Sequence, residues 1–476
     1  MKAHRNPKEA LDVRSRALAY GVVLACMVLI GGAGCGSQDD AAPGGVSGMV
    51  AAPLGWNSWN SGIALTENNI HEVVDAMVSS GMRDAGYRYV DLDAGWAAPQ
   101  RDGDGKLRAD PVRFPHGMAA LAEYAHQRGM LLGLYSSPYN QTCGQAPGNA
   151  SGGHESTDAQ TFAAWGVDLL KYDWCRNDAD LGEQVRVFTA MRDALRHTGR
   201  RIVYSINPNS SANPGAGSGY DWSTVADMSR TAGDLIPLWH NDLLDHRGEN
   251  SNGGMFLGVT DQLAAAEPLS GRVRPGYWND PDMLVVGVQL TDFIGTHLDG
   301  FPVEVLTGTL TTRQIIQLES SMEISPTVIA QLREPSRNLT LDEQRAHFSL
   351  WAMLAAPLLA GNDVRSMSED TRSVLTNTDV IAVDQDPAVV QATRLPGDPR
   401  ILRRTLADGS VAVAMFNFGD TTATIGTDAA AVGLRQASCY TVRDLWTHTT
   451  TTTTGSVTGA DLPAHGVAMM KVAPVC

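Results

Sequence analysis

The stretch Val167-Asp-Leu-Leu-Lys-Tyr-Asp173 is a short apolar run that ends on a lysine and an aspartate. Similar runs recur between about residues 54 and 383, and helix-like stretches lie between them. This alternation predicts parallel βα units, and eight such units predict a closed (β/α)8 barrel. The strand candidates are residues 54–57, 87–93, 131–135, 167–173, 202–206, 226–230, 276–279 and 357–360. The main helix candidates are residues 70–82, 118–128, 159–165, 181–196 and 341–354.

The rest of the chain differs from this pattern in two places. Residues 288–338 interrupt the alternation, and we interpret them as an insertion within a barrel that extends over residues 51–388. Short alternating runs then begin, such as Val411-Ala-Val-Ala-Met-Phe416, and they predict a C-terminal antiparallel β-sandwich over residues 389–476. A chain of 476 residues has room for both domains.

The first 35 residues have the composition of an export signal. Basic residues precede an apolar run from Ala17 to Ile30, and small residues follow up to Cys35. The apolar run is shorter than the roughly 20 residues that a membrane-spanning helix needs. Two outcomes remain open, lipid attachment to Cys35 with residues 36–50 as a polar tether, or ordinary cleavage nearby. We therefore expect an exported protein, either secreted or anchored to a membrane as a lipoprotein.

Charge and cysteine content narrow the possible partners. The formal net charge is −16 and no run of Lys and Arg occurs, which argues against nucleic acid as a partner. Besides Cys35, four cysteines follow the signal, and an even number in an oxidising compartment predicts two disulfides. They are Cys143, Cys175, Cys439 and Cys476. Neither CxxC nor HExxH occurs, so we predict no metal and no cofactor.

Two aspartates stand where a barrel of this kind carries its reacting groups, just after the strands. Asp173 ends one strand candidate, and Asp234 follows another in Arg230-Thr-Ala-Gly-Asp234, two units further along. A carboxylate at the end of a buried strand is costly to desolvate, so it is often functional, although a satisfied structural aspartate is the alternative. Glycoside cleavage needs two facing carboxylates, one to protonate the leaving oxygen and one to stabilise or capture the cationic carbon. Composition alone does not select this pair from 52 acidic residues.

A set of motifs, in order along about residues 53–387, resembles glycoside hydrolase family 27. The motifs are Gly55-Trp-Asn-Ser-Trp-Asn60, Lys171-Tyr-Asp-Trp-Cys175, Trp278-Asn-Asp-Pro-Asp-Met283, and Glu343-Gln-Arg-Ala-His-Phe-Ser-Leu-Trp-Ala-Met353 with Ala356-Pro-Leu-Leu359. The resemblance implies a retaining α-galactosidase with a β-sandwich after its barrel. It also implies that Asp173 is the nucleophile and that Asp234 is the acid/base.

The same resemblance implies roles for other residues. Lys171 and Arg230 match residues that bind sugar hydroxyls, and both cations would favour the ionised aspartates nearby. Trp56 and Tyr135 match aromatic residues of the sugar pocket, although either ring could belong to the core instead. Two further inferences concern the cysteines and a pair of acidic residues. Cys143 and Cys175 match a family disulfide, Cys439 pairs with Cys476 by elimination, and Asp280 and Asp282 are expected to be structural.

The chain departs from the family at two places. Typical members carry two adjacent aspartates for the 4- and 6-hydroxyls of the sugar, and here Asp93 matches the first but Ala94 occupies the second. Ser205-Ile-Asn-Pro208 replaces the usual contacts after the fifth strand, so we expect Asn207 to reach the 2-position.

The predicted function is hydrolysis of terminal α-D-galactosyl residues from oligo- or polysaccharides. Because Ala94 removes one acceptor, the family's isomaltose-releasing dextran hydrolase, α-N-acetylgalactosaminidase and β-L-arabinopyranosidase activities stay open as alternatives. An inactive surface sugar-binding protein is a further alternative, and retention of both catalytic aspartates argues against it.

Overall fold

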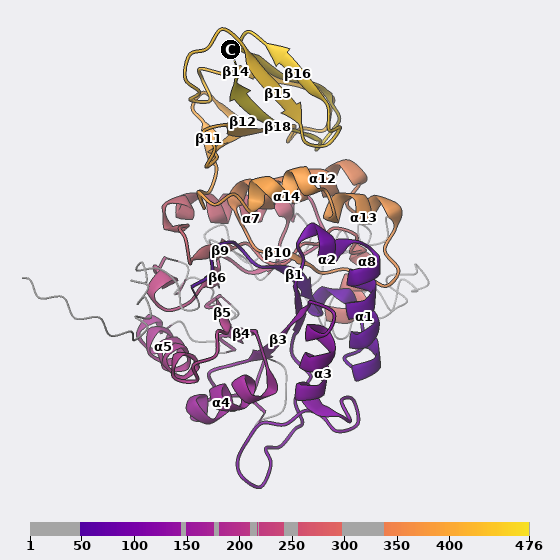
Figure 1. Cartoon of the computed structure of the whole chain (residues 1–476), viewed down its shortest axis with the longest axis vertical. Helices are drawn as coiled ribbons and strands as arrows, with labels where there is room; N and C mark the ends of the chain where they lie inside the picture. Colours follow the sequence, from indigo (N-terminus) through magenta and orange to yellow (C-terminus); the bar gives the residue numbers. More distant parts are fainter. Residues whose placement is uncertain are drawn as a thin grey trace, which may run out of the picture. The chain divides into compact units, whose positions relative to one another are not determined.

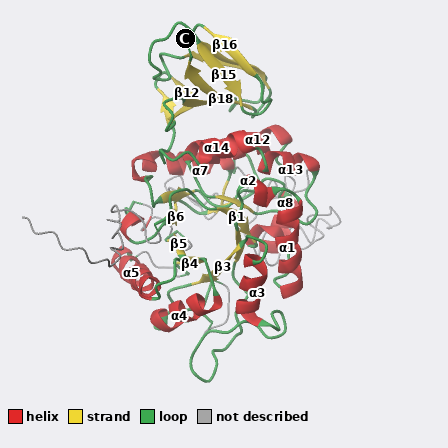
Figure 2. Cartoon of the chain, viewed as in Figure 1, coloured by secondary structure: helices red, strands yellow, loops and turns green. Residues whose placement is uncertain are grey.

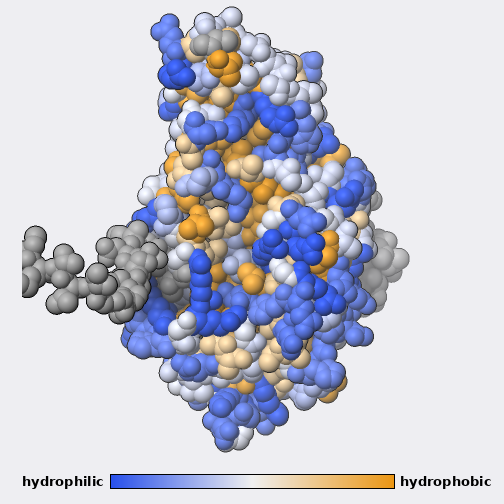
Figure 3. Space-filling view, in the orientation of Figure 1, coloured by the Kyte–Doolittle hydropathy of each residue, from blue (hydrophilic) through white to orange (hydrophobic). Residues whose placement is uncertain are grey.

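The computed structural model describes residues 48–143, 149–175, 180–209, 217, 219–241, 256–297 and 338–475. These residues all belong to one compact unit, Pro43–Cys476. The predicted export signal, Cys35, Cys476 and most of the 288–338 insertion lie outside the described residues. Within the described part of the chain, no helix has the length and apolar character needed to cross a membrane. Hydrophilic residues predominate on the face drawn in Figure 3, with smaller hydrophobic areas between them.

Eight parallel strands form the first domain, in the order β10-β1-β2-β3-β4-β5-β6-β9 (Figure 1). A parallel bridge between Leu284, just after β9, and Ala360 of β10 joins the two ends of this sheet, so the barrel is closed. Each strand overlaps one of the eight predicted runs, which confirms the predicted fold. The strands are β1 Leu54–Asn57, β2 Tyr89–Leu92, β3 Leu131–Ser136, β4 Leu169–Asp173, β5 Val203–Asn207, β6 Met228–Arg230, β9 Trp278–Asp280 and β10 Leu358–Ala360.

Helices surround these strands (Figure 2). Several begin at a side chain that caps the free backbone N–H groups of the first turn. At α12, for example, Thr340 accepts from the backbone N–H of Glu343 while the Glu343 carboxylate accepts from that of Thr340. The helices are α1 Glu67–Ser79, α2 Met82–Ala85, α3 Gly117–His126, α4 Glu155–Trp165, α5 Leu181–His197, α7 Val259–Ala266, α8 Leu290–His297, α12 Leu341–Leu354, α13 Glu369–Leu375 and α14 Thr378–Asp384. Short 3-10 turns cover Trp59–Ser61, Trp222–Thr224 and Glu267–Arg272.

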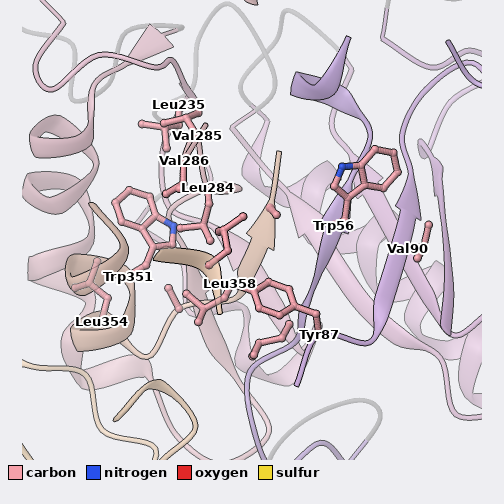
Figure 4. Packing of buried hydrophobic residues seen from close by; sticks show 14 of the residues in the cluster. Trp56, Tyr87, Val90, Leu235, Leu284, Val285, Val286, Trp351, Leu354 and Leu358 are labelled. Atoms are coloured by element: carbon pink, nitrogen blue, oxygen red, sulfur yellow. The ribbon is translucent and has the colours of Figure 1, made fainter. Parts of the chain in front are cut away.

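Large side chains fill the space between strands and helices (Figure 4). Trp56 of β1 and Trp351 of α12 have no exposed surface, and Leu284 and Leu358 are equally buried. The Asp91 side chain of β2 occupies the space beside Gly133 of β3, since a Cβ at Gly133 would lie 1.8 Å from the Asp91 carboxylate. A glycine is therefore required at that position of β3.

The second domain is a β-sandwich, as predicted. Its larger sheet has the antiparallel order β11-β12-β13-β18-β15-β16, and β14 pairs with β17 in the smaller one. The Thr-rich segment Thr450–Thr453 is the edge strand β16 of the larger sheet, and it pairs with β15. The strands are β11 Thr393–Leu395, β12 Asp398–Thr405, β13 Val411–Phe416, β14 Ala423–Asp428, β15 Tyr440–Asp444, β16 Thr450–Thr453, β17 Ser456–Leu462 and β18 Val467–Pro474.

Hydrogen bonds join the sandwich to the α12–α14 side of the barrel. The buried Arg404 guanidinium donates to the carbonyl of Ala352 at 2.7 Å, and Asn377 Nδ2 donates to the carbonyl of Leu445 at 2.9 Å. Trp446 Nε1 donates to Ser349 Oγ at 3.0 Å. These contacts involve backbone and neutral groups as well as a charged side chain, and they join the two domains.

Candidate active site

The carboxyl ends of neighbouring barrel strands bring most of the predicted site residues together. In the register of the sheet, Asp173 of β4 lies beside Asn207 of β5, and Arg230 of β6 lies beside Asp280 of β9. Asp93 directly follows β2. Because all these strands run in the same direction, their side chains meet at one end of the barrel.

A lysine and two aspartates form the first charged group of the site. Lys171 Nζ lies 2.7 Å from Asp93 Oδ2 and 3.7 Å from Asp173 Oδ2. Burial opposes the charge on Lys171, but Asp173 and Asp93 outweigh it and raise the pKa of Lys171 above its usual range. Lys171 is therefore a permanent cation between two carboxylates.

Neighbouring polar groups fix the orientation of Asp93. Asn57 Nδ2 donates to Asp93 Oδ2 at 3.2 Å, and the backbone N–H of Asp93 donates to Ser58 Oγ at 2.9 Å. The backbone N–H of Ala94 donates to Asp93 Oδ1 at 2.8 Å. Asn57 was not among the predicted site residues, although it ends a predicted strand as Asp173 does. The rule that selected Asp173 would also have found it.

Asp173 lies deeper than a free carboxylate normally would, with only 8% of its side chain exposed. Burial raises the pKa of Asp173 to about 7, while Lys171 and Arg230 act in the opposite direction. Tyr135 of β3 lies nearby, with its ring centroid 5.3 Å from Lys171 Nζ. Burial first, and then the charge of Asp173, raises the pKa of its phenol. The buried carboxylate thus has two cations and a phenol around it.

Arg230 connects the second candidate carboxylate to the site. Its Nη2 lies 3.2 Å from Asp234 Oδ1 and 3.0 Å from Asp282 Oδ2, and it donates to the carbonyl of Gly233 at 2.6 Å. Only 3% of the Arg230 side chain is exposed, whereas 37% of the Asp234 side chain is exposed. One arginine therefore holds the loop that carries Asp234, and the carboxylate itself faces the solvent side.

Asp282 is the structural partner of this arrangement. It adopts a left-handed conformation with φ 84°, which is rare for a residue other than glycine. Its Oδ2 accepts from the backbone N–H of Leu235 at 2.7 Å, and its carbonyl accepts from Trp351 Nε1 at 2.8 Å. Asp282 thus fixes both Arg230 and the residue after Asp234. The backbone conformation that allows this is not readable from the sequence.

The disulfide between Cys143 and Cys175 is present, as the family resemblance implied. It joins the segment after β3 to the segment two residues beyond Asp173. The Tyr135 hydroxyl lies 3.4 Å from Cys175 Sγ. Cys439 is also disulfide-bonded, and its predicted partner Cys476 lies outside the described residues.

Two predicted substrate-binding residues have little or no free surface. Trp56 is fully enclosed in the core, and its Nε1 donates to the carbonyl of Asn362 at 2.8 Å. That the Trp56 ring lines a sugar pocket stays a prediction. Asn207 is 2% exposed, and its Oδ1 accepts from the backbone N–H of Asn209 at 3.0 Å.

Comparisons with known proteins agree with this geometry. Residues 58–292 and 335–386 match the family model described as Alpha galactosidase A, and residues 396–472 match the Alpha galactosidase C-terminal beta sandwich domain. Alpha-galactosidase A of Cellvibrio japonicus is 34% identical over 435 residues, which cover 88% of this chain and 91% of that protein.

Solved structures give the same picture. Alpha-galactosidase I from Mortierella vinacea superposes with a TM-score of 0.72 at 28% identity, covering 90% of this chain and 98% of that one. The α-galactosidase of Saccharomyces cerevisiae, solved with raffinose, superposes with a TM-score of 0.71 at 25% identity and the same coverage. Barrel, sandwich and site motifs thus agree, and the chain belongs to the alpha-galactosidase A family, glycoside hydrolase family 27.

Proposed function

We propose that this chain is a retaining α-galactosidase in which Asp173 forms a covalent bond to the sugar and Asp234 transfers the proton. One observation carries the proposal. Two carboxylates of different exposure, 8% for Asp173 and 37% for Asp234, share the field of Arg230 at one end of the barrel. Two carboxyl groups whose surroundings differ in this way can take different roles in one reaction.

The difference in exposure supports the assignment of the two roles. In an enzyme that removes a terminal sugar, the anomeric carbon lies deep in the site and the remainder of the substrate lies toward solvent. The acid must reach the oxygen between them, which suits the more exposed Asp234. The buried Asp173, flanked by Lys171, suits the attack on carbon, and Lys171 would favour its ionised form.

The reaction then follows in two steps. Asp173 attacks the anomeric carbon while protonated Asp234 gives its proton to the departing oxygen, so the glycosidic bond breaks and a glycosyl ester forms. Asp234, now ionised, removes a proton from water, the water attacks the same carbon, and Asp173 is released. Two inversions leave the anomeric configuration unchanged. The two carboxyl groups are predicted to lie about 5 to 5.5 Å apart for this outcome.

Asp93, Lys171, Tyr135, Arg230 and Asn207 are the proposed sugar-binding residues. Asp93 and Lys171 can accept from and donate to hydroxyl groups, since each still has hydrogen-bonding capacity beyond their mutual contact. Oligosaccharides such as the raffinose bound to the Saccharomyces cerevisiae relative are the proposed substrate class. The Cys143–Cys175 disulfide supports export. The proposal keeps both outcomes for the exported chain, secretion or attachment to a membrane through a lipid on Cys35.

The test is a panel of nitrophenyl glycosides followed by proton NMR of the first product. We expect nitrophenyl α-D-galactoside to be hydrolysed fastest and α-galactose to form before mutarotation. First-formed β-galactose would contradict the double displacement. If an α-glucoside, an α-N-acetylgalactosaminide or a β-L-arabinopyranoside were cleaved faster, the chain would be assigned that other activity of the family.

The pH profile tests the role of Asp173 separately. A nucleophile must be ionised, and burial raises the pKa of Asp173 to about 7, so kcat/KM should rise as the pH increases through that value. If Asp173 were the proton donor, the rate would fall over the same interval.

A further inference from the structure

A cavity of about 630 Å³ lies where the barrel meets the sandwich, and none of its lining residues belongs to the proposed active site. Leu238 and Trp239 come from the loop after Asp234, and Thr260 and Leu263 come from α7. The sandwich contributes Phe418, Asp420 and His465, among others. Cavities of this volume are within the range of small-molecule binding sites.

Aromatic rings form one side of this cavity. Trp239 stacks on His465 with ring centroids 5.1 Å apart, and Phe418 lies 6.2 Å from Trp239 at an interplanar angle of 28°. The carbonyl of Trp239 accepts from the backbone N–H of Thr260 at 3.0 Å, so the start of α7 fixes this residue. Trp239 and Phe418 thus contribute aromatic surface to the cavity lining, and such surface suits the C–H face of a pyranose.

The charged groups around the cavity are already paired. His465 Nδ1 lies 2.6 Å from Glu343 Oε1, and His240 Nδ1 lies 2.6 Å from Asp261 Oδ1. Arg394 pairs with Glu267. Asp420 Oδ1 lies 3.3 Å from His465 Nε2 and its side chain is 96% exposed, so the carboxylates give this lining an acidic character. The acidic lining disfavours an anion, while the remaining lone pairs and N–H groups can exchange hydrogen bonds with hydroxyl groups. A neutral, hydroxyl-rich ligand fits this lining better than an anionic one.

We propose that this cavity is a second carbohydrate-binding site, which holds a neutral polysaccharide chain away from the point of cleavage. The helix α7 separates it from the catalytic loop, because Gln262 donates to the carbonyl of Gly233 at 2.7 Å while the adjacent Leu263 lines the cavity. The site goes beyond the proposed function, since binding here involves neither Asp173 nor Asp234. It would keep the enzyme on a polymer between cleavage events.

The experiment is electrophoresis of the full chain through native gels that contain soluble glucomannan, which offers no galactosyl group to the active site. We expect retardation by glucomannan and none by polygalacturonate. Trp239→Ala should weaken apparent binding about fivefold or more, since it removes the stacking surface. Trp446→Ala is the matched control, because this tryptophan is also half-buried but lies outside the cavity.

A second variant keeps the test independent of the catalytic loop. Phe418→Leu removes an aromatic face on the sandwich side and should weaken glucomannan binding while leaving nitrophenyl galactoside hydrolysis within about twofold. Unchanged retardation in both cavity variants, an equal loss in Trp446→Ala, or retardation by polygalacturonate would each overturn the proposal. If the unmodified chain is retarded by glucomannan but hydrolyses no galactoside, the proposed function fails and the second site stands.

Discussion

The mouth of the barrel and the surface of the sandwich both pair lysine with aspartate, but the two pairs differ in burial. Lys171 and Asp173 have side chains 15% and 8% exposed, whereas Lys471 and Asp408 have side chains 39% and 56% exposed. Burial raises the pKa of Asp173 to about 7. Hydrogen bonds from Lys471 and Ser410 lower that of Asp408 to about 2.

The difference in burial distinguishes a pair suited to catalysis from a pair that only stabilises the surface. An exposed ion pair contributes about 0 to 1 kcal/mol and is screened by salt. A buried carboxylate is costly to desolvate even beside a cation. A cluster of buried carboxylates is therefore expected mainly where a reaction requires them. The Lys471–Asp408 pair of the sandwich is therefore the reference for effects expected only at the barrel mouth.

The largest effect is expected for Asp173→Asn, which should lower kcat by at least about 10⁴-fold on every substrate. Among the described residues, Asp173 is the carboxylate that we assign to the covalent intermediate. Asp408→Asn, the same change on the sandwich, should leave kcat within about twofold. Steady-state rates on nitrophenyl α-galactoside check both, and near-normal activity of Asp173→Asn would contradict the role assigned to it.

Asp234→Asn should show a smaller loss that depends on the leaving group. A proton donor contributes about 10² to 10⁴-fold, and good leaving groups need less of it. The loss should therefore be greater on raffinose than on a nitrophenyl galactoside, and added azide should partly restore turnover with formation of a galactosyl azide. Equal losses on both substrates, with no azide product, would show that Asp234 does not transfer the proton.

The two disulfides extend the comparison to stability. Cys143→Ser should lower the free energy of unfolding by about 2 to 4 kcal/mol and reduce activity, because the bridge holds the segment after Asp173. Cys439→Ser in the sandwich should lower stability without a matching loss of activity at 25 °C. Chemical denaturation and rate measurements on both variants check this. If Cys439→Ser lowered activity as much as Cys143→Ser, the loss would come from general unfolding and not from the segment after Asp173.

Patterns of residues predicted most of the fold because each strand has a local signature. All eight barrel strands overlap predicted runs, and residues 341–354 form a helix with the predicted bounds. Helix α4 begins at Glu155, earlier than predicted, because its first turn is polar and lacks the apolar spacing that marks a helix.

The site was harder to predict where it depends on contacts distant in sequence. Asp173 and Asp234 could be selected because they follow strands and match a family motif. Trp56 matches a family motif in the same way, but its complete burial and its hydrogen bond to the carbonyl of Asn362 depend on residues distant in sequence. The contacts of Asp282 with Arg230 and Leu235 depend on the left-handed backbone of Asp282. They also depend on its hydrogen bond from Trp351, 69 residues away. Neither feature has a local sequence signature.

A smaller effect is expected for Ala94→Asp, which adds a carboxylate beside Asp93 at the barrel mouth. Ala94 is only partly buried, so the new side chain has room to reach a sugar hydroxyl. We expect kcat/KM for α-galactosides to improve by a few-fold, about 1 kcal/mol of added binding in the transition state. A fall in kcat/KM, with an efficient unmodified enzyme, would mean that another residue already supplies this contact.

The smallest effect concerns stability and has opposite signs in the two regions. Because the pKa of Asp173 is raised on folding, its contribution to stability is present below pH 4 and is lost as the pH rises through about 7. Asp173→Asn should therefore raise Tm at pH 8 and leave it unchanged at pH 4.

The pKa of Asp408 is lowered, so its contribution is present above pH 4 and is lost as the pH falls through about 2. Asp408→Asn should slightly lower Tm at pH 8, and added salt should reduce that difference because the pair is exposed. Differential scanning calorimetry of the two variants at both pH values checks the signs. If Asp173→Asn lowered Tm at pH 8, the carboxylate would be stabilising the fold, and its burial would have to be explained by structure rather than by chemistry.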